Sequence, residues 1–251
     1  MNKIYILLIL LILSCSKPVE KPNLLFILVD DLGWTDVSYN GSDFYETQNI
    51  DRLSLNSMLF YNAYASSSVC SPTRAAIMTG KHPARVNITD WIPGLEEQPH
   101  YNNKNKPLIG PQDLNELPLS EITIAEVLKK NGYKTFYSGK WHLGSEGHYP
   151  EDQGFDINVG GFEKGSPMGG YYTPYKNPKL EDGPEGEYLT DRLTQETIDF
   201  IDSRDESKPF AAFLAFYNVH TPIQENKEFY YYYKEKLKGY DDVEPVTKTE
   251  G

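Results

Sequence analysis

The sequence predicts an α/β fold in which a mostly parallel central sheet carries helices on both faces. The runs 24–29 and 210–217 are continuously apolar, as in strands buried on both faces, and 134–138 is expected as the strand between them in the chain. A helical pattern precedes each of the two later strands, over 122–131 and 191–203. Helix followed by strand, repeated along the chain, is the arrangement that builds a parallel sheet.

The first strand, 24–29, is expected at the centre of the sheet because every one of its residues is apolar. Short helices are predicted at 48–56, where apolar residues have helical spacing, and at 71–79, where Pro72 occupies a first-turn position that tolerates proline. Residues 87–119 are rich in Pro, Asn and Gly and lack periodicity. They are expected to form a long surface insertion, the kind of segment that sets specificity.

A short polar cluster follows each predicted strand. In an open α/β sheet, ligands bind outside the carboxyl ends of the strands. We therefore expect one functional site at that edge, built from Asp30 and Asp31, from Lys140, Trp141 and His142, and from Asn218, Val219 and His220.

Composition narrows the class of protein. The 251 residues include 36 Asp and Glu against 24 Lys and Arg, a formal charge of −12 spread along the chain, so a nucleic acid partner is not expected. The hydrophobic share of 39% supports a globular core, and two cysteines are too few for a disulfide-stapled miniprotein. One domain, 23–251, is the expected organisation.

The N-terminus has the pattern of an export signal. Lys3 precedes the apolar run 4–13, which is too short for a bilayer span of about 20 residues but suits a signal peptide at 1–14. The residues up to Cys15 resemble a bacterial lipobox, which implies acylation of Cys15, attachment to a membrane by lipid and a place in the bacterial cell envelope, in the periplasm or outer membrane. Residues 15–22 would then be a polar tether.

Cys70 stands at the start of a predicted helix, four residues before Arg74. Helix N-termini lower the pKa of a cysteine thiol and favour bound anions, and an arginine fork suits a tetrahedral oxyanion. These residues alone predict a nucleophile or an anion site, with a packed thiol beside a surface arginine as the alternative. A disulfide between Cys15 and Cys70 is a further alternative in an exported chain, and acylation of Cys15 would leave Cys70 alone.

Asp30 and Asp31 follow the first strand as an adjacent acidic pair. Two neighbouring carboxylates repel one another unless a cation or proton lies between them, and hard divalent ions take carboxylate oxygens as ligands. Asp-Asp is also ordinary turn chemistry. A metal site and a simple turn both remain open on these residues alone.

Four motifs together resemble one family. Residues 70–81, CSPTRAAIMTGK, match the first sulfatase signature, and 139–144, GKWHLG, match the second. The opening strand with Asp30 and Asp31, and the later His220-Thr221-Pro222, are similar to two further family elements. The chain therefore resembles a type I, formylglycine-dependent sulfatase of the alkaline-phosphatase-like superfamily.

The resemblance implies a role for each matching residue. Cys70 would be oxidised by a formylglycine-generating enzyme, and Asp30, Asp31 and residue 70 would hold a divalent cation, usually Ca²⁺. Arg74 would support the nucleophile and the metal site. Lys140, His142 and His220 would contact the sulfate or transfer protons during its release.

One departure accompanies the resemblance. Sulfatases complete the metal site with a second acidic pair and a further lysine well downstream of the His-x-Pro element, but only 29 residues follow Pro222. Asp241 and Asp242 lie too soon after His220 to fill that role. We therefore expect an N-terminal portion of the catalytic domain, truncated, whose competence as an enzyme is open.

Three functions are compatible with these motifs. The first is removal of sulfate from a sulfated carbohydrate, preferred to a small aryl sulfate. The second is a phosphodiesterase or phosphonate hydrolase of the same superfamily, and the third is a non-catalytic lipoprotein that binds sulfated glycans. Residues 230–233, four tyrosines, are expected at a partly exposed loop edge, with a sugar-stacking platform as the alternative.

Overall fold

The computed structural model describes residues 20–93 and 113–240. The signal peptide, Cys15, most of the tether and Asp241–Asp242 lie outside these residues. Among the described residues, no helix combines the length and apolar character that a bilayer span requires.

The sheet is parallel, in the strand order β1-β4-β2-β3. Three of its strands coincide with the segments that the sequence predicted as strands. The bounds are β1 (Leu24–Leu28), β2 (Lys134–Gly139), β3 (Ile157–Val159) and β4 (Phe210–Ala215). The short β3 was not predicted, because three residues give too little periodicity to recognise.

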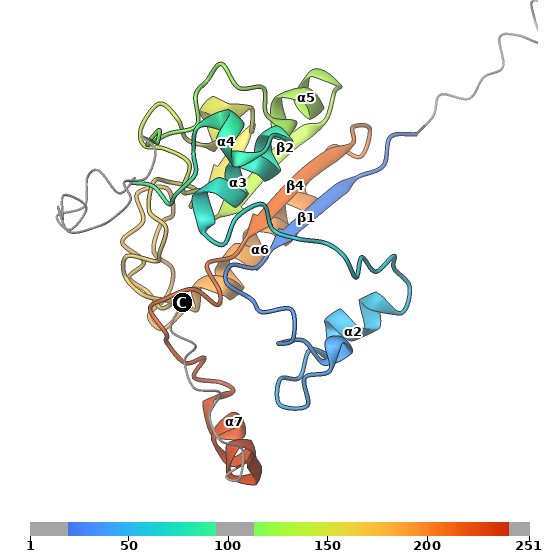
Figure 1. The fold of residues 1–251 in the computed structure, drawn as a ribbon, viewed down its shortest axis with the longest axis vertical. Helices are drawn as coiled ribbons and strands as arrows, with labels where there is room; N and C mark the ends of the chain where they lie inside the picture. Colours follow the sequence, from blue (N-terminus) through green and yellow to red (C-terminus); the bar gives the residue numbers. More distant parts are fainter. Residues whose placement is uncertain (1–19, 94–112, 241–251) are drawn as a thin grey trace, which may run out of the picture.

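Helices cover both faces of the sheet, as predicted (Figure 1). The α-helices are α2 (Gln48–Ser54), α3 (Cys70–Thr79), α4 (Pro83–Val86), α5 (Ile124–Lys130), α6 (Leu189–Asp202) and α7 (Tyr230–Leu237). Short 3₁₀ turns lie at η1 (Ser38–Asn40), η3 (Pro150–Gln153) and η4 (Lys238–Tyr240).

Strand alternation divides the core between the two helical layers. Tyr137 and Phe213 point toward the face that also buries Ala75 of α3 and Ala125 of α5. Phe136, one residue earlier on β2, packs with α6 on the opposite face, where its ring stacks on Phe200 at 4.4 Å between centroids. Each helical layer therefore fixes the strands from its own side.

Helix α5 begins and ends where its sequence directs. Thr123 and Glu126 form a reciprocal capping box that satisfies backbone N–H groups at the first turn. Its buried contact is Ala125, however, whereas Ile124 and Val127 are 40% and 47% exposed. The small Ala125 therefore makes the close approach to the core, while Ile124 and Val127 stay partly exposed.

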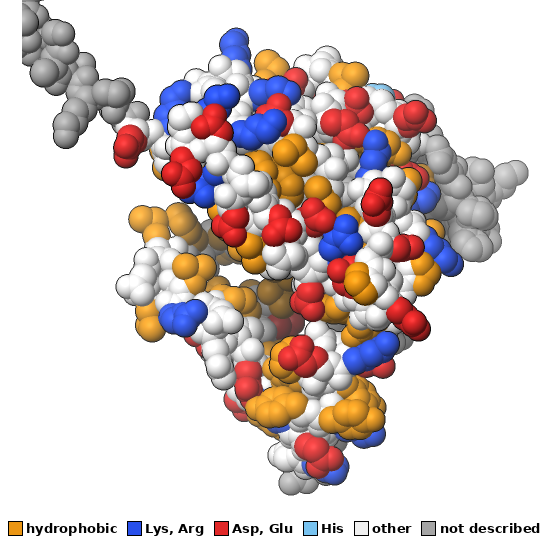
Figure 2. Space-filling view, turned by 180° about the vertical axis from the view of Figure 1, so that it is seen from behind, with side chains coloured by type: hydrophobic (Ala, Val, Ile, Leu, Met, Phe, Trp, Pro, Cys, Tyr) orange, Lys and Arg blue, Asp and Glu red, His pale blue; other side chains and the backbone are white. Residues whose placement is uncertain are grey.

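The expected central position of the first strand is also wrong. The strand β1 has only β4 as a hydrogen-bonded neighbour in the described sheet, and Leu25 and Ile27 are 49% and 52% exposed. An all-apolar run predicts burial, but the described residues do not supply a second neighbour for it. Hydrophobic side chains also gather on the arm that carries α2 (Figure 2), where Leu55 and Tyr61 are both 83% exposed.

Two loop predictions need correction. The ends of the 87–119 segment are not surface loop, since Ile88 and Leu117 are fully buried in the core beside α3. The tyrosines at 230–233 begin helix α7 instead of forming a loop edge. The Tyr232 hydroxyl donates a hydrogen bond to Glu46, and Lys236 Nζ lies 2.7 Å from the same carboxylate, so this helix is held to the segment before α2.

Candidate active site at the carboxyl edge of the sheet

Strand ends position the first site residues. Asp30 follows β1 by two residues, and its backbone N–H donates to the carbonyl of Asn218 at 2.7 Å. Lys140 directly follows β2, and its N–H donates to the carbonyl of Ala215 at 2.8 Å. These bonds extend the parallel ladder beyond the strands. The polar clusters predicted after β1, β2 and β4 are therefore brought to one edge.

Gly139 permits the close approach of the Lys140 segment to β4. Its φ is +102°, and a Cβ at this position would lie 2.0 Å from the Ala215 carbonyl oxygen. A side chain would clash with backbone, which cannot yield cheaply. Gly139 is thus required for Lys140 to enter the site.

Helix α3 supplies Cys70 and Arg74. Cys70 is its first residue, after an extended Val69, and Arg74 is buried one turn later. Ser71 is also fully buried, and its hydroxyl accepts a hydrogen bond from the Ile92 N–H at 3.0 Å. The first turn of the helix therefore presents the thiol to the pocket while its neighbours fix the backbone.

The Asp30 carboxylate is the centre of the buried polar network. Arg74 Nη2 lies 2.7 Å and Lys140 Nζ 2.5 Å from Asp30 Oδ2, while the Cys70 thiol donates to Oδ1 at 3.4 Å. Lys140 is fully buried, and its Nζ also lies 3.1 Å from Cys70 Sγ. One carboxylate thus pairs with two buried cations beside the thiol.

The pKa values of the network follow from burial and these charges. Burial works to raise the pKa of Asp30, but the charges of Arg74 and Lys140 outweigh it and lower that pKa to about 2. For Cys70 the balance is reversed: burial raises the pKa of the thiol, although Lys140 opposes the change. The expectation that the helix N-terminus lowers the Cys70 pKa is therefore wrong in this structure, since desolvation of the thiolate is the larger effect.

The backbone of Lys140 is held from two sides. Both the Arg74 guanidinium and the Tyr137 hydroxyl donate hydrogen bonds to its carbonyl oxygen. Burial raises the pKa of Tyr137 to about 12, so this hydroxyl stays protonated and remains a donor at neutral pH. Tyr137 is a supporting residue that the sequence motifs did not indicate.

His142 is a buried neutral imidazole with one nitrogen left for a ligand. Burial, and after it the charge of Lys140, lowers the pKa of His142 to about 4. Because its Nε2 is hydrogen-bonded to the Ile92 carbonyl, that nitrogen carries the proton and Nδ1 is an acceptor. Nδ1 is buried and has no hydrogen-bond partner in the described structure. A buried acceptor of this kind points to a donor supplied by a bound molecule.

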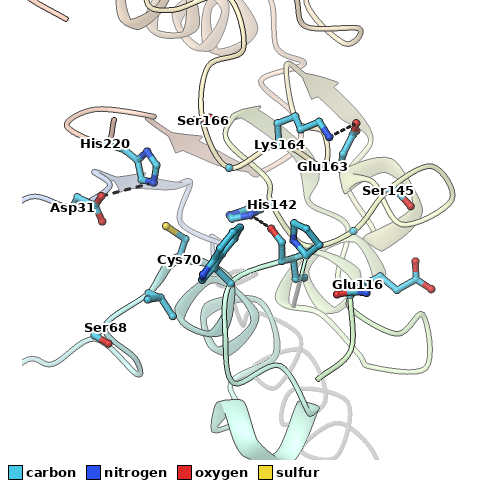
Figure 3. A pocket seen from close by; sticks show the side chains of 17 residues that line it. Asp31, Ser68, Cys70, Glu116, His142, Ser145, Glu163, Lys164, Ser166 and His220 are labelled. Carbon is cyan, nitrogen blue, oxygen red and sulfur yellow. Dashed lines mark hydrogen bonds and ion pairs between the residues drawn. The ribbon is translucent and has the colours of Figure 1, made fainter. Parts of the chain in front are cut away.

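His220 lies across the pocket with Asp31 (Figure 3). Its Nε2 is 3.9 Å from Asp31 Oδ2, and both side chains are partly exposed. The Tyr171 hydroxyl contacts the carbonyls of Tyr217 and His220, at 2.9 and 2.8 Å. Tyr171 therefore fixes the backbone that carries His220, although no sequence motif pointed to it.

The site contains a group of residues that fits part of a metal coordination sphere. Ligand atoms of Asp30, Asp31 and Cys70 lie within 4.8 Å of one another. Carboxylate oxygens suit hard divalent cations, which supports the predicted donor set. These side chains are fewer than the six to eight oxygens that Ca²⁺ takes, so they account for only one side of such a site.

A cavity of about 810 Å³ opens above these residues. Cys70, His142, His220 and Asp31 line one part of it, and Figure 3 shows Glu116, Glu163 and Lys164 on the side away from Cys70. Arg74 and Lys140 lie beneath, in the buried network. The acidic pair, the thiol, the two cations and the two histidines therefore belong to one continuous site. Three residues expected there do not line the cavity: Trp141 is buried in the hydrophobic core, and Asn218 and Val219 lie outside the cavity lining. The pocket-lining residues Trp91, Glu116, Glu163 and Lys164 were not predicted, because no motif distinguishes them from other loop residues.

A buried cation pair, a thiol and two histidines thus meet at the carboxyl edge of the α/β sheet. The sulfatase family model matches residues 22–248, and the chain belongs to that family, the type I sulfatases of the alkaline-phosphatase-like superfamily.

Known sulfatases are similar in sequence and in structure. Human N-acetylgalactosamine-6-sulfatase (Homo sapiens) is 31% identical over 236 residues, with 86% of this chain and 43% of that protein covered. Human arylsulfatase G is 36% identical over 170 residues, with 67% and 29% covered. The chain thus spans less than half the length of these relatives.

Solved structures give the same fold. The crystal structure of Ps i-CgsB in complex with k-i-k-neocarrahexaose superposes with a TM-score of 0.67 and 28% identity, covering 90% of this chain and 50% of that one. The structure of BT4656 in complex with its substrate D-glucosamine-2-N,6-O-disulfate gives 0.66 and 25%, covering 90% and 40%.

Proposed function

We propose that the protein containing this chain hydrolyses sulfate esters of carbohydrates, with formylglycine derived from Cys70 as nucleophile and Ca²⁺ as metal. The observation that carries the proposal is the convergence of Cys70, Lys140 and His142 beside the Asp30 carboxylate. Sulfatase relatives named for, or solved with, sulfated sugars support the carbohydrate class.

Residue 70 acts at the pocket floor. As formylglycine it supplies a hydroxyl from the aldehyde hydrate, and the second hydroxyl of the hydrate allows sulfate to be released. Arg74 and Lys140 hold the Asp30 carboxylate, and Lys140 Nζ, 3.1 Å from Cys70 Sγ, places a positive charge where sulfate oxygens would gather.

The two histidines lie on different sides of the pocket. His142 offers an unprotonated Nδ1 at neutral pH, which suits acceptance of a proton from the nucleophilic residue as sulfate departs. His220 is on the opposite side and more exposed, near Asp31. A protonated His220 would give a proton to the leaving alcohol.

Asp30, Asp31 and residue 70 would hold the divalent cation. When bound, the cation neutralises sulfate oxygens and acts as a Lewis acid. Asp30 and Asp31 would also orient the residue 70 hydroxyl toward sulfur.

The proposed cellular setting follows from the N-terminal sequence. Export, acylation of Cys15 and a place in the bacterial cell envelope are part of the proposal, as is maturation by a formylglycine-generating enzyme. Palmitate labelling of the full chain in a bacterial host tests the anchor: the Cys15→Ala variant should not be labelled, and equal labelling of both chains would contradict it.

Sulfate release tests the reaction. The protein that contains this chain, produced with a formylglycine-generating enzyme, is mixed in excess over a sulfated hexose in millimolar Ca²⁺, and inorganic sulfate is measured over time. We expect release by the matured protein and none above background by its Cys70→Ser variant, because a serine ester has no second hydroxyl to expel sulfate. Equal release by the two proteins, or release of phosphate from a phosphate ester instead, would overturn the proposal.

A further inference from the structure

Three loops around the pocket are bonded to the two residues His142 and Leu143. The His142 ring bonds to the carbonyl of Ile92, and the His142 N–H donates to the carbonyl of Phe162 at 3.2 Å. The Leu143 carbonyl accepts from the N–H of Leu117 at 2.8 Å. Separate parts of the chain are thus fixed to the segment that carries the buried imidazole.

Each loop presents an adjacent residue to the cavity. Trp91 precedes Ile92, Glu116 precedes Leu117, and Glu163 follows Phe162; all three line the pocket. Their distance from the reactive end is therefore set by hydrogen bonds to the 142–143 segment. This is the arrangement of a preformed binding wall.

Trp91 gives this wall an apolar face. Its side chain is 38% exposed, although the backbone around it is held by hydrogen bonds. The Trp91 N–H donates to Asp90 Oδ1 at 2.8 Å, and the Ile92 N–H donates to the Ser71 hydroxyl. The indole therefore keeps a surface open to the cavity close in sequence to the contact with helix α3. A flat apolar face with a polar edge is suited to the C–H face of a sugar ring.

Two carboxylates and one lysine are the charged groups of the remaining wall. Glu163 accepts a hydrogen bond from the Tyr149 hydroxyl at 2.9 Å, and its other oxygen lies 3.7 Å from Lys164 Nζ. Glu116 lies opposite the nucleophilic end and has His148 Nδ1 at 3.2 Å. Lys164 is the single lysine among the described lining residues, against Glu116, Glu163 and Asp31. Carboxylates accept hydrogen bonds from hydroxyls and repel a second anionic group.

We propose that Trp91, Glu116 and Glu163 form a subsite for a neutral sugar ring that carries one sulfate and free hydroxyls elsewhere. The inference rests on the proposed function and adds the substrate class: sugars with a second sulfate or a carboxylate next to the reacting sulfate are disfavoured. Trp91 stacks on the ring, and the two glutamates accept hydroxyl hydrogen bonds and exclude further anions.

Calorimetric titration of the full chain tests the subsite without requiring turnover. The ligands are a methyl hexoside with one sulfate, the same hexoside with two sulfates, and sodium sulfate. We expect Trp91→Ala to weaken binding of the monosulfated sugar about tenfold, with Trp91→Phe restoring most of it and sodium sulfate unaffected. Trp34→Ala is the matched control, since Trp34 is 76% exposed and does not line this pocket.

The charge selection has its own readout. The wild-type chain should bind the monosulfated sugar more tightly than the disulfated sugar, and Glu163→Gln should reduce that preference about fivefold by removing a repulsive charge. The subsite would be overturned if wild type and Trp91→Ala bound the monosulfated sugar equally, or if wild type preferred the disulfated sugar. Either result would leave the proposed function standing. Absence of binding by both sodium sulfate and the monosulfated sugar would overturn both.

Discussion

Substituting Asp30 by Asn should destabilise the fold far more than the same change at its neighbour. Asp30 is 7% exposed and pairs with Arg74 and Lys140, both buried. Asn keeps the size of the side chain but removes the negative charge. The variant therefore leaves two buried cations without their counter-ion.

The magnitude follows from two routes. A fall in the pKa of Asp30 from 3.8 to about 2 corresponds to about 2 kcal/mol of stability at neutral pH. Breaking a buried ion pair by removing one partner costs about 3–5 kcal/mol, because the remaining charge stays desolvated. The second estimate includes the cost of leaving Arg74 and Lys140 buried without a counter-ion, so we expect the free energy of unfolding to fall by about 3 kcal/mol or more.

Urea unfolding of the full chain at pH 7, followed by circular dichroism, measures the loss. Asp31→Asn is the matched control because Asp31 has a 52% exposed side chain and a φ of 59°, which Asn tolerates well. The control should stay within about 0.5 kcal/mol of wild type. An Asp30→Asn variant within about 1 kcal/mol of the control would refute the ion-pair account.

Three further outcomes are expected. The pKa of His142 is about 4 in the folded chain against 6.5 ordinarily, so the unfolded chain binds more protons between these pH values. The free energy of unfolding should therefore fall by about 3 kcal/mol as the pH drops from neutral to 4, and by less in His142→Asn. Urea titrations at several pH values measure this fall. Gly139→Ala should lower stability by about 3 kcal/mol more than Gly132→Ala, since Gly132 also has positive φ but open space around it; equal Tm values would contradict the steric argument. Tyr171→Phe should cost about 1–2 kcal/mol and speed amide exchange around His220, and unchanged exchange would show that the hydroxyl does not fix that backbone.

The sequence was informative where pattern and burial agree. The segment 210–217 predicted a strand, and β4 is buried along its whole length between two neighbours. The polar residues after the strands met at one edge because parallel strands share a direction. Membership of the sulfatase family, expected from the motifs around Cys70 and Lys140, is confirmed.

Other features depend on contacts that a single sequence does not encode locally. The apolar pattern of 24–29 predicts burial, but it does not state which neighbour provides it, and β1 lies at an edge of the described sheet. The Cys70 pKa depends on desolvation, which helix position alone does not reveal. Trp91 and Glu163 line the pocket next to Ile92 and Phe162, whose carbonyls are hydrogen-bonded to His142 far along the chain.

The identity of residue 70 after maturation tests the central claim most directly. The full chain is co-expressed with a formylglycine-generating enzyme, and the tryptic peptide containing residue 70 is weighed by mass spectrometry beside the peptide from chain expressed without that enzyme. We expect the matured peptide to be lighter by about 18 Da, the conversion of thiol to aldehyde that creates the nucleophile. A Cys70 peptide that retains its thiol mass under conditions that mature another sulfatase in the same cells would contradict the account.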